Sequence, residues 1–146
     1  MAERQLCATV VGGDDMSPSI RPGERLRITP AASDRIVAGD VIVFKRHVLI
    51  AHRVMGAARA FGRTYFITRG DRCPYIDSPV SEDLVAGIII GKRLRLVTSL
   101  RQRVALTGVV LWYIAAVRVL RGRAFRIANS FARRVASYGL PEMPAA

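Results

Sequence analysis

Four aspartates and one histidine are the residues of this chain whose types are most suited to acid-base or metal chemistry. They are Asp14, Asp15, His52, Asp71 and Asp77. Carboxylate oxygens and imidazole nitrogens bind divalent metals, but the spacing of these residues matches no ligand motif. Cys7 and Cys73 lie far apart and form no paired C-x-x-C motif, so we expect reduced thiols. The sequence therefore predicts neither a metal site nor a cofactor.

Three segments carry motifs that follow one another in a defined order. The first, from Val10 to Gly23, reads VVGGDDMSPSIRPG. The second joins GDVIVF at residues 39–44 to AHRV at residues 51–54, and the third joins TRGD at residues 68–71 to YID at residues 75–77. Each motif alone is a weak signal, but three in the same order are specific. Together, over roughly residues 8–93, they resemble the signal peptidase I and LexA-type serine peptidase group, in its histidine-type archaeal and endoplasmic-reticulum form.

The resemblance implies a role for each matching residue. In this family a serine followed by Met-x-Pro attacks the peptide carbonyl, and a lysine or histidine takes the proton of the serine. By resemblance, His52 is that general base, and Asp71 or Asp77 is the acid that supports it. The backbone amides near residue 15 would form the oxyanion hole. At the position of the serine itself, this chain has Asp15.

Asp15 breaks the catalytic scheme at its first step. Attack on an amide by a carboxylate would create a mixed anhydride that is more reactive than the amide, so aspartate does not replace serine in peptide hydrolysis. Ser17 and Ser19 lie two and four residues beyond the nucleophile position, and catalysis tolerates little displacement. The structural interpretation of Asp15 is that it accepts hydrogen bonds from turn amides or pairs with His52.

Two functions follow from these residues, and the sequence leaves both open. The first is a catalytically defective, signal-peptidase-like protein that binds an extended peptide by strand addition near a membrane. The second is an active membrane-associated serine endopeptidase of the signal peptidase type, which would use Ser17 or another nucleophile. In either case the expected partner is a peptide or a protein segment.

The elements that must position these residues are short β-strands. Six β-rich runs are separated by Gly, Pro and Asp turn signals, and no ten-residue helical period occurs among them. The runs are Leu6–Val11, Arg25–Thr29, Val41–Phe44, Val48–Met55, Tyr65–Thr68 and Val85–Leu96. We expect a mainly β, signal-peptidase-like compact domain over residues 1–96, with His47 in a solvated hairpin turn.

Residues 97–146 form a basic region with a helical pattern. From Leu106 to Val135 apolar residues recur at spacings near three and four, as in an amphipathic helix, and Val104–Val117 is apolar on every side. Residues 92–146 hold eleven Arg and Lys against one acid, a net charge of +10. Residues 1–91 hold twelve Arg and Lys against ten acids, a net charge of +2. The C-terminal region is therefore suited to an anionic partner.

An anionic membrane surface is the partner that this region favours. A helix lying in the interface or a short span would fit it, and arginines among so many aliphatic residues suit lipid better than nucleic acid. The alternative is a helix that packs on the β domain and solvates its arginines. Residues 1–8 contain no apolar signal segment, so we expect a membrane-associated protein of cytoplasmic origin without a signal peptide.

Overall fold

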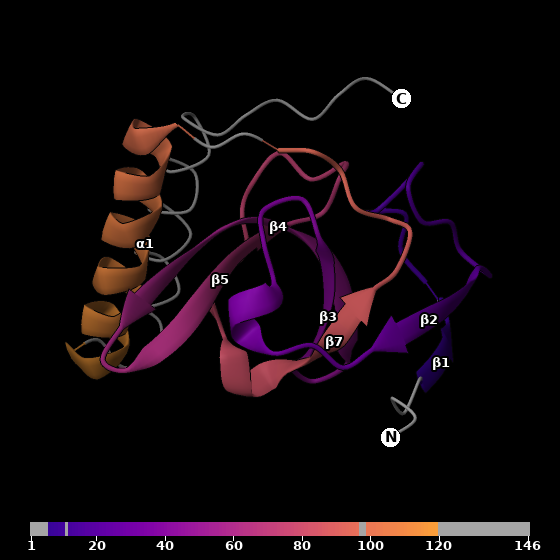
Figure 1. Cartoon of the computed structure of the whole chain (residues 1–146), viewed down its shortest axis with the longest axis horizontal. Helices are drawn as coiled ribbons and strands as arrows, with labels where there is room; N and C mark the ends of the chain where they lie inside the picture. The colour runs from indigo at the N-terminus through magenta and orange to yellow at the C-terminus, as the bar shows by residue number, and fades with distance from the viewer. Residues whose placement is uncertain (1–5, 11, 97–98, 120–146) are drawn as a thin grey trace.

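The computed structural model describes residues 6–10, 12–96 and 99–119. In that part of the chain, seven strands form one antiparallel sheet in the order β1-β2-β7-β3-β4-β5-β6, and one long helix follows (Figure 1). The strands are β1 (Leu6–Thr9), β2 (Arg25–Thr29), β3 (Val41–Lys45), β4 (Leu49–Ala60), β5 (Arg63–Arg69), β6 (Val80–Ser81) and β7 (Val85–Ile89). The helical elements are the 3-10 turns η1 (Ser33–Arg35) and η2 (Glu82–Leu84) and the α-helix α1 (Leu100–Val119). The predicted mainly β fold with a C-terminal helical extension is confirmed.

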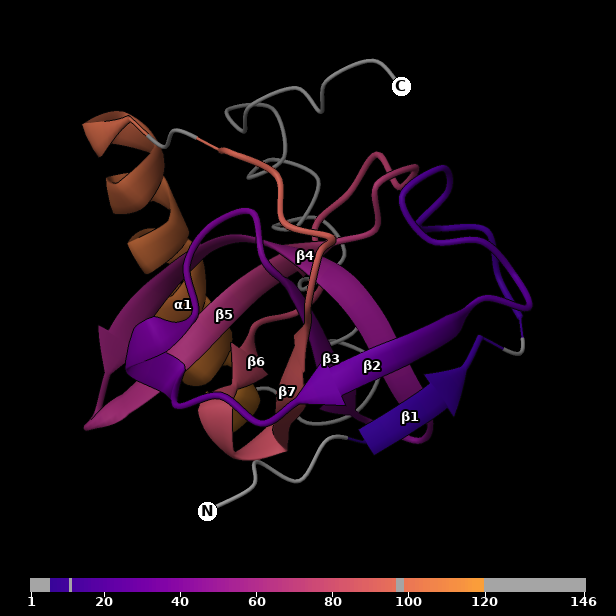
Figure 2. The ribbon, with the colours of Figure 1, turned by 45° about the vertical axis from the view of Figure 1, so that its right-hand side comes forward.

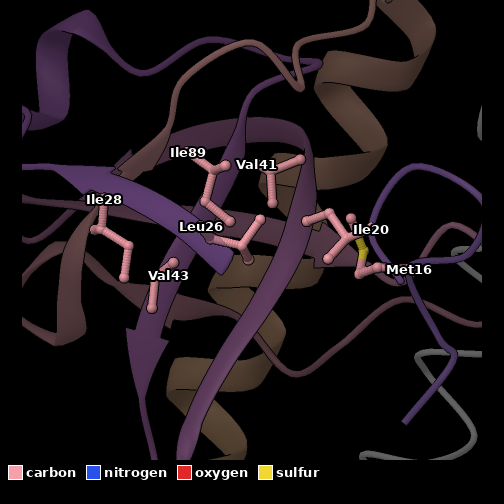
Figure 3. Close-up of a cluster of buried hydrophobic side chains, with 7 residues drawn as sticks. All are labelled: Met16, Ile20, Leu26, Ile28, Val41, Val43 and Ile89. Atoms are coloured by element: carbon pink, nitrogen blue, oxygen red, sulfur yellow. The ribbon is translucent and has the colours of Figure 1, made fainter. Parts of the chain in front are cut away.

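The sheet curls (Figure 2), and side chains on both faces of its central strand β3 are buried. Successive side chains of a strand point to opposite faces, so Val41 and Val43 lie on one face and Ile42 and Phe44 on the other. On the first face, the two valines complete a cluster with Met16, Ile20, Leu26, Ile28 and Ile89 (Figure 3). On the second, Ile42 and Phe44 pack with Ile36, Val54, Phe66 and Val80. The curled sheet therefore holds two apolar layers, and the first of them borders the candidate site.

Helix α1 packs on the β4–β5 hairpin, at the opposite end of the domain from β1 and β2 (Figure 1). Leu106, Val110 and Ile114 recur at a spacing of four residues and form a third cluster with Ile67 of β5 and with Ile76 of the loop after β5, among others. Gly56 on β4 permits this contact, because a Cβ there would lie 2.4 Å from Cδ1 of Leu106. Packing of the helix on the β domain, which the sequence analysis gave as the alternative to membrane contact, is thus observed for one face of α1.

Other apolar side chains of α1 are exposed. Leu100, Val104, Leu111 and Val117 are each about half exposed or more. The stretch from Leu100 to Val117 is long and apolar enough, by length and composition, to cross a membrane or to lie on one. The predicted apolar pattern continues to Val135, but residues 120–146 lie outside the described part of the chain.

Some element boundaries differ from those predicted. The run Val85–Leu96 forms a strand only as far as Ile89, because the chain turns at Gly91, which has a φ of +81°. Beyond the turn, the N–H of Leu94 donates to the carbonyl oxygen of Gly39 at 3.0 Å. Strand β4 extends beyond the predicted Met55 to Ala60, and β6 was not predicted. His47 lies exposed in the β3–β4 turn, as expected.

Candidate functional site

An apolar groove of about 720 Å³ lies between the β1–β2 hairpin and the β3–β4 hairpin. Its walls come from β1, β2, β3 and the first residues of β4, and Met16 and Ile20 add apolar surface from the first motif. Met16 and Ile20 pack on Leu26 of β2, which fixes the motif against the sheet (Figure 3). Asp15 and His52 both line this groove. The first and second motifs, far apart in sequence, therefore meet at one apolar groove.

His52 is paired with Asp77. Its Nδ1 lies 2.5 Å from Oδ2 of Asp77, and the hydroxyl of Thr68 donates to the same oxygen at 2.7 Å. The N–H of Asp77 donates in turn to the carbonyl oxygen of Thr68 at 2.7 Å, which fixes the loop that carries the carboxylate. An ionised carboxylate only accepts, so in a neutral imidazole with this partner Nδ1 is the donor and Nε2 of His52 is left as the acceptor. This is the arrangement that a general base requires.

Asp71 pairs with Arg53 and not with His52. Both of its oxygens accept from the guanidinium of Arg53, Oδ1 from Nε and Oδ2 from Nη2, each at 2.7 Å. The two hydrogen bonds make this a bidentate ion pair. It is desolvated, because the side chain of Arg53 is fully buried and that of Asp71 is 4% exposed. The resemblance left Asp71 and Asp77 as two candidates for the acid that supports His52. In the structure, Asp77 pairs with His52, and Asp71 pairs with Arg53.

Arg53 is a positioning residue that the sequence analysis missed. Besides Asp71, its guanidinium donates to the carbonyl oxygens of Gly39 at 2.8 Å and Lys92 at 2.7 Å, and to Oγ of Ser19 at 3.1 Å. These bonds tie the first, second and third motifs to the segment after β7. The sequence did contain a signal for this role. Arg53 follows His52 in a strand whose alternate side chains point into the core, and a buried arginine needs a carboxylate partner unless its guanidinium reaches solvent.

Asp15 lies in the exposed loop before β2 and is held by its backbone and by Cys73. Its carbonyl oxygen accepts from the N–H of Arg72 at 2.8 Å, and Gly70 is so close that a Cβ there would lie 2.9 Å from the same oxygen. Burial of Cys73, followed by the charge of Asp15 and a hydrogen bond with its carboxylate, raises the pKa of the Cys73 thiol. The carboxylate of Asp15 therefore bonds to Cys73, whereas Nδ1 of His52 bonds to Asp77.

Other side chains near Asp15 offer no activated nucleophile in the described part of the site. The hydroxyl of Ser19 is bonded to Arg53, and Ser17 is not among the residues that line the groove. The raised pKa of Cys73 keeps its thiol protonated, and the thiolate is the nucleophilic form. The groove is thus lined by a histidine that is bonded to Asp77 and by Asp15, the residue that the resemblance aligns with the nucleophilic serine.

The acidic residues are each paired within the protein rather than gathered around a shared point. Asp14 pairs with Arg72, Asp71 with Arg53 and Asp77 with His52. Among residues 6–10, 12–96 and 99–119, no three His, Cys, Asp or Glu side chains are placed to hold a metal ion. The chemistry that this geometry offers is therefore proton transfer by His52. Comparisons of the chain with protein-family models, with curated proteins and with solved structures each find no match.

Proposed function

We propose that this chain is a signal-peptidase-like protein that binds extended peptides in its apolar groove without cleaving them. The observation that supports this most strongly is the shared position of Asp15 and His52 in the groove, with Asp77 bonded to His52 at 2.5 Å. The pair supplies an oriented base, and the groove supplies an apolar surface for a substrate-like chain. Asp15 removes the nucleophile, so binding remains and hydrolysis does not.

The backbone at the groove has unpaired strand edges that suit a peptide. In the described part of the sheet, β1 pairs with β2 alone, and pairing of β4 with β5 begins only at Arg53. Residues 49–52 of β4 therefore have β3 as their one neighbouring strand. An extended peptide can add its N–H and C=O groups to such edges, while the apolar walls accept every second side chain.

The helix α1 supports attachment to a membrane surface. Its buried face contacts the sheet through Leu106, Val110 and Ile114, which would pull part of the β domain into the bilayer if the helix crossed it. Its exposed apolar face, with Val104 and Leu111, is free to enter the interface instead. The net charge of +10 over residues 92–146 favours anionic lipid. We therefore propose a helix that lies in the interface, with one face on the domain and the other in lipid.

Peptide binding is tested by titrating the ¹⁵N-labelled protein with an apolar peptide of alternating valine and alanine that carries a lysine at each end. Shifts confined to amides of β1 and of the first residues of β4 are the expected result. Leu49→Asp places a charge in the groove at an exposed side chain and should weaken binding about 10-fold or more. Leu84→Asp changes an exposed leucine outside the groove and serves as the matched control. Equal binding by the two variants would contradict the proposal.

A further inference from the structure

A second cavity, of about 800 Å³, opens between the sheet and the first turns of α1. Its lining is unlike that of the peptide groove, because Arg93 and Arg95 from the segment after β7 and Arg103 from α1 surround it. The other described lining residues include Leu94, Leu96 and Leu106, and none of the described lining residues is acidic. A cavity lined by three arginines and several apolar residues suits a ligand that is anionic at one end and apolar at the other.

The walls of this cavity are fixed by close backbone contacts. The segment that carries Arg93 and Arg95 crosses Gly39 so closely that a Cβ at Gly39 would lie 1.7 Å from the carbonyl oxygen of Leu94. The buried guanidinium of Arg53 holds the carbonyl oxygen of Lys92 at the start of the same segment. On the sheet side the lining includes Ala38, Gly56 and Ala57. These residues have no side chain beyond Cβ, so they leave the volume open.

The arginines of the cavity carry positive charge that the described residues neutralise only in part. Arg93 pairs with Asp40 at 3.3 Å, and Asp40 also accepts from the N–H of Val37. For Arg95 and Arg103, the described residues include no acidic partner. Arginine binds phosphate oxygens through two parallel hydrogen bonds. Three arginines around one opening therefore favour a phosphate, which has several charged oxygens, over an anion with a single charge.

The position of the cavity indicates where the phosphate would come from. It lies at the first turns of α1, and the exposed apolar face of that helix begins there with Leu100 and Val104. We propose that this cavity binds the phosphate headgroup of an anionic membrane phospholipid, with the acyl chains along the exposed face of α1. The inference depends on the membrane attachment proposed above and adds a defined lipid site to it. A helix lying in the interface would place the arginines at the depth of the headgroups.

The test compares two triple variants of the full chain that remove the same charge. Arg93→Gln, Arg95→Gln and Arg103→Gln empty the cavity of its guanidinium groups, whereas Arg21→Gln, Arg25→Gln and Arg27→Gln remove three exposed arginines at the other end of the domain. Binding is measured to phosphatidylglycerol vesicles and to phosphatidylcholine vesicles. The readouts are cosedimentation and the fluorescence of Trp112, the single tryptophan, which lies in α1.

The expected result is a loss of about 10- to 100-fold in binding to phosphatidylglycerol for the cavity variant, and little change for the control variant. Equal losses in both variants would mean that binding follows net charge, which overturns the lipid site while leaving membrane attachment intact. Absence of vesicle binding by the unmodified chain would instead overturn the membrane attachment on which the site depends. Full competition by millimolar glycerol phosphate, with no blue shift of Trp112 on vesicles, would identify a soluble phosphate ligand and refute the lipid.

Discussion

Nδ1 of His52 lies 2.5 Å from Oδ2 of Asp77, and the two residues are twenty-five positions apart in the sequence. His52 comes from β4 and Asp77 from the loop after β5, so the fold, not the local sequence, creates the pair. The hydroxyl of Thr68 donates to the same carboxylate oxygen and fixes its orientation. His52 and Asp15 both line the apolar groove. In the function proposed above, His52 is the base of a peptidase-like site, and Asp15 stands in the place of its nucleophile.

Removing one partner of the buried pair of Arg53 and Asp71 should cost more stability than removing one partner of an exposed pair. Asp71→Asn leaves the guanidinium of Arg53, which is fully buried, without a counter-charge. We expect a loss of about 3–5 kcal/mol in the free energy of unfolding, measured by urea denaturation. Asp83→Asn is the control, because Asp83 and its partner Arg63 are both more than half exposed. A loss in Asp71→Asn no larger than in Asp83→Asn would contradict the role given to Arg53.

Docking of α1 on the sheet depends on the absence of a side chain at Gly56. Gly56→Ala forces the buried side chain of Leu106 to move and should cost about 1–3 kcal/mol in unfolding free energy. Gly108→Ala, at a helix position with no atom within 4 Å of the new Cβ, should instead stabilise the helix by up to about 1 kcal/mol. In a Leu106→Ala background the cost of Gly56→Ala should largely disappear. A cost that stays the same in that background would show that the two residues do not meet.

The reactivity of Cys73 reports on the carboxylate of Asp15. The charge of Asp15 and its hydrogen bond both raise the pKa of the thiol, so removing the charge lowers that pKa and increases the thiolate fraction at any fixed pH below it. Asp15→Asn should therefore speed alkylation of Cys73 by iodoacetamide at pH 8. The exposed Cys7 is replaced by serine in both proteins so that a single thiol is followed. Slower or unchanged alkylation would indicate that the two side chains are not neighbours.

Much of the sheet follows from the sequence, because alternation in strands such as β2 records directly which side chains are buried. Leu26 and Ile28 are buried in β2, whereas Arg25 and Arg27, which alternate with them, are exposed. The end of β7 could not be predicted from the sequence, because apolar residues continue to recur from Ile88 to Leu96. The strand ends because the chain turns at Gly91 and then crosses Gly39. The contact of α1 with the hairpin did not follow either. An apolar helix face has no signature for which surface covers it.

The residues of the candidate site were predictable, but their pairing was not. Spacing and resemblance selected Asp15, His52, Asp71 and Asp77, and Asp15 and His52 line one groove. The sequence could not choose between Asp71 and Asp77, because the choice depends on Arg53. The side chain of Arg53 is buried on the face of β4 opposite to that of His52, and it donates to both oxygens of Asp71. Because Arg53 pairs with Asp71, Asp77 is the acid that pairs with His52, and the sequence motif does not show this.

The proposed function requires His52 to be a working base in a groove that lacks only the nucleophile. Labelling by a fluorophosphonate probe tests it directly, because the probe reacts with a serine whose proton a neighbouring base removes. The unmodified chain should remain unlabelled, and Asp15→Ser should be labelled at the substituted position. Adding His52→Ala to that variant should abolish the labelling. Labelling of the unmodified chain at Ser17, or a folded, peptide-binding Asp15→Ser variant that stays unlabelled, would contradict the claim.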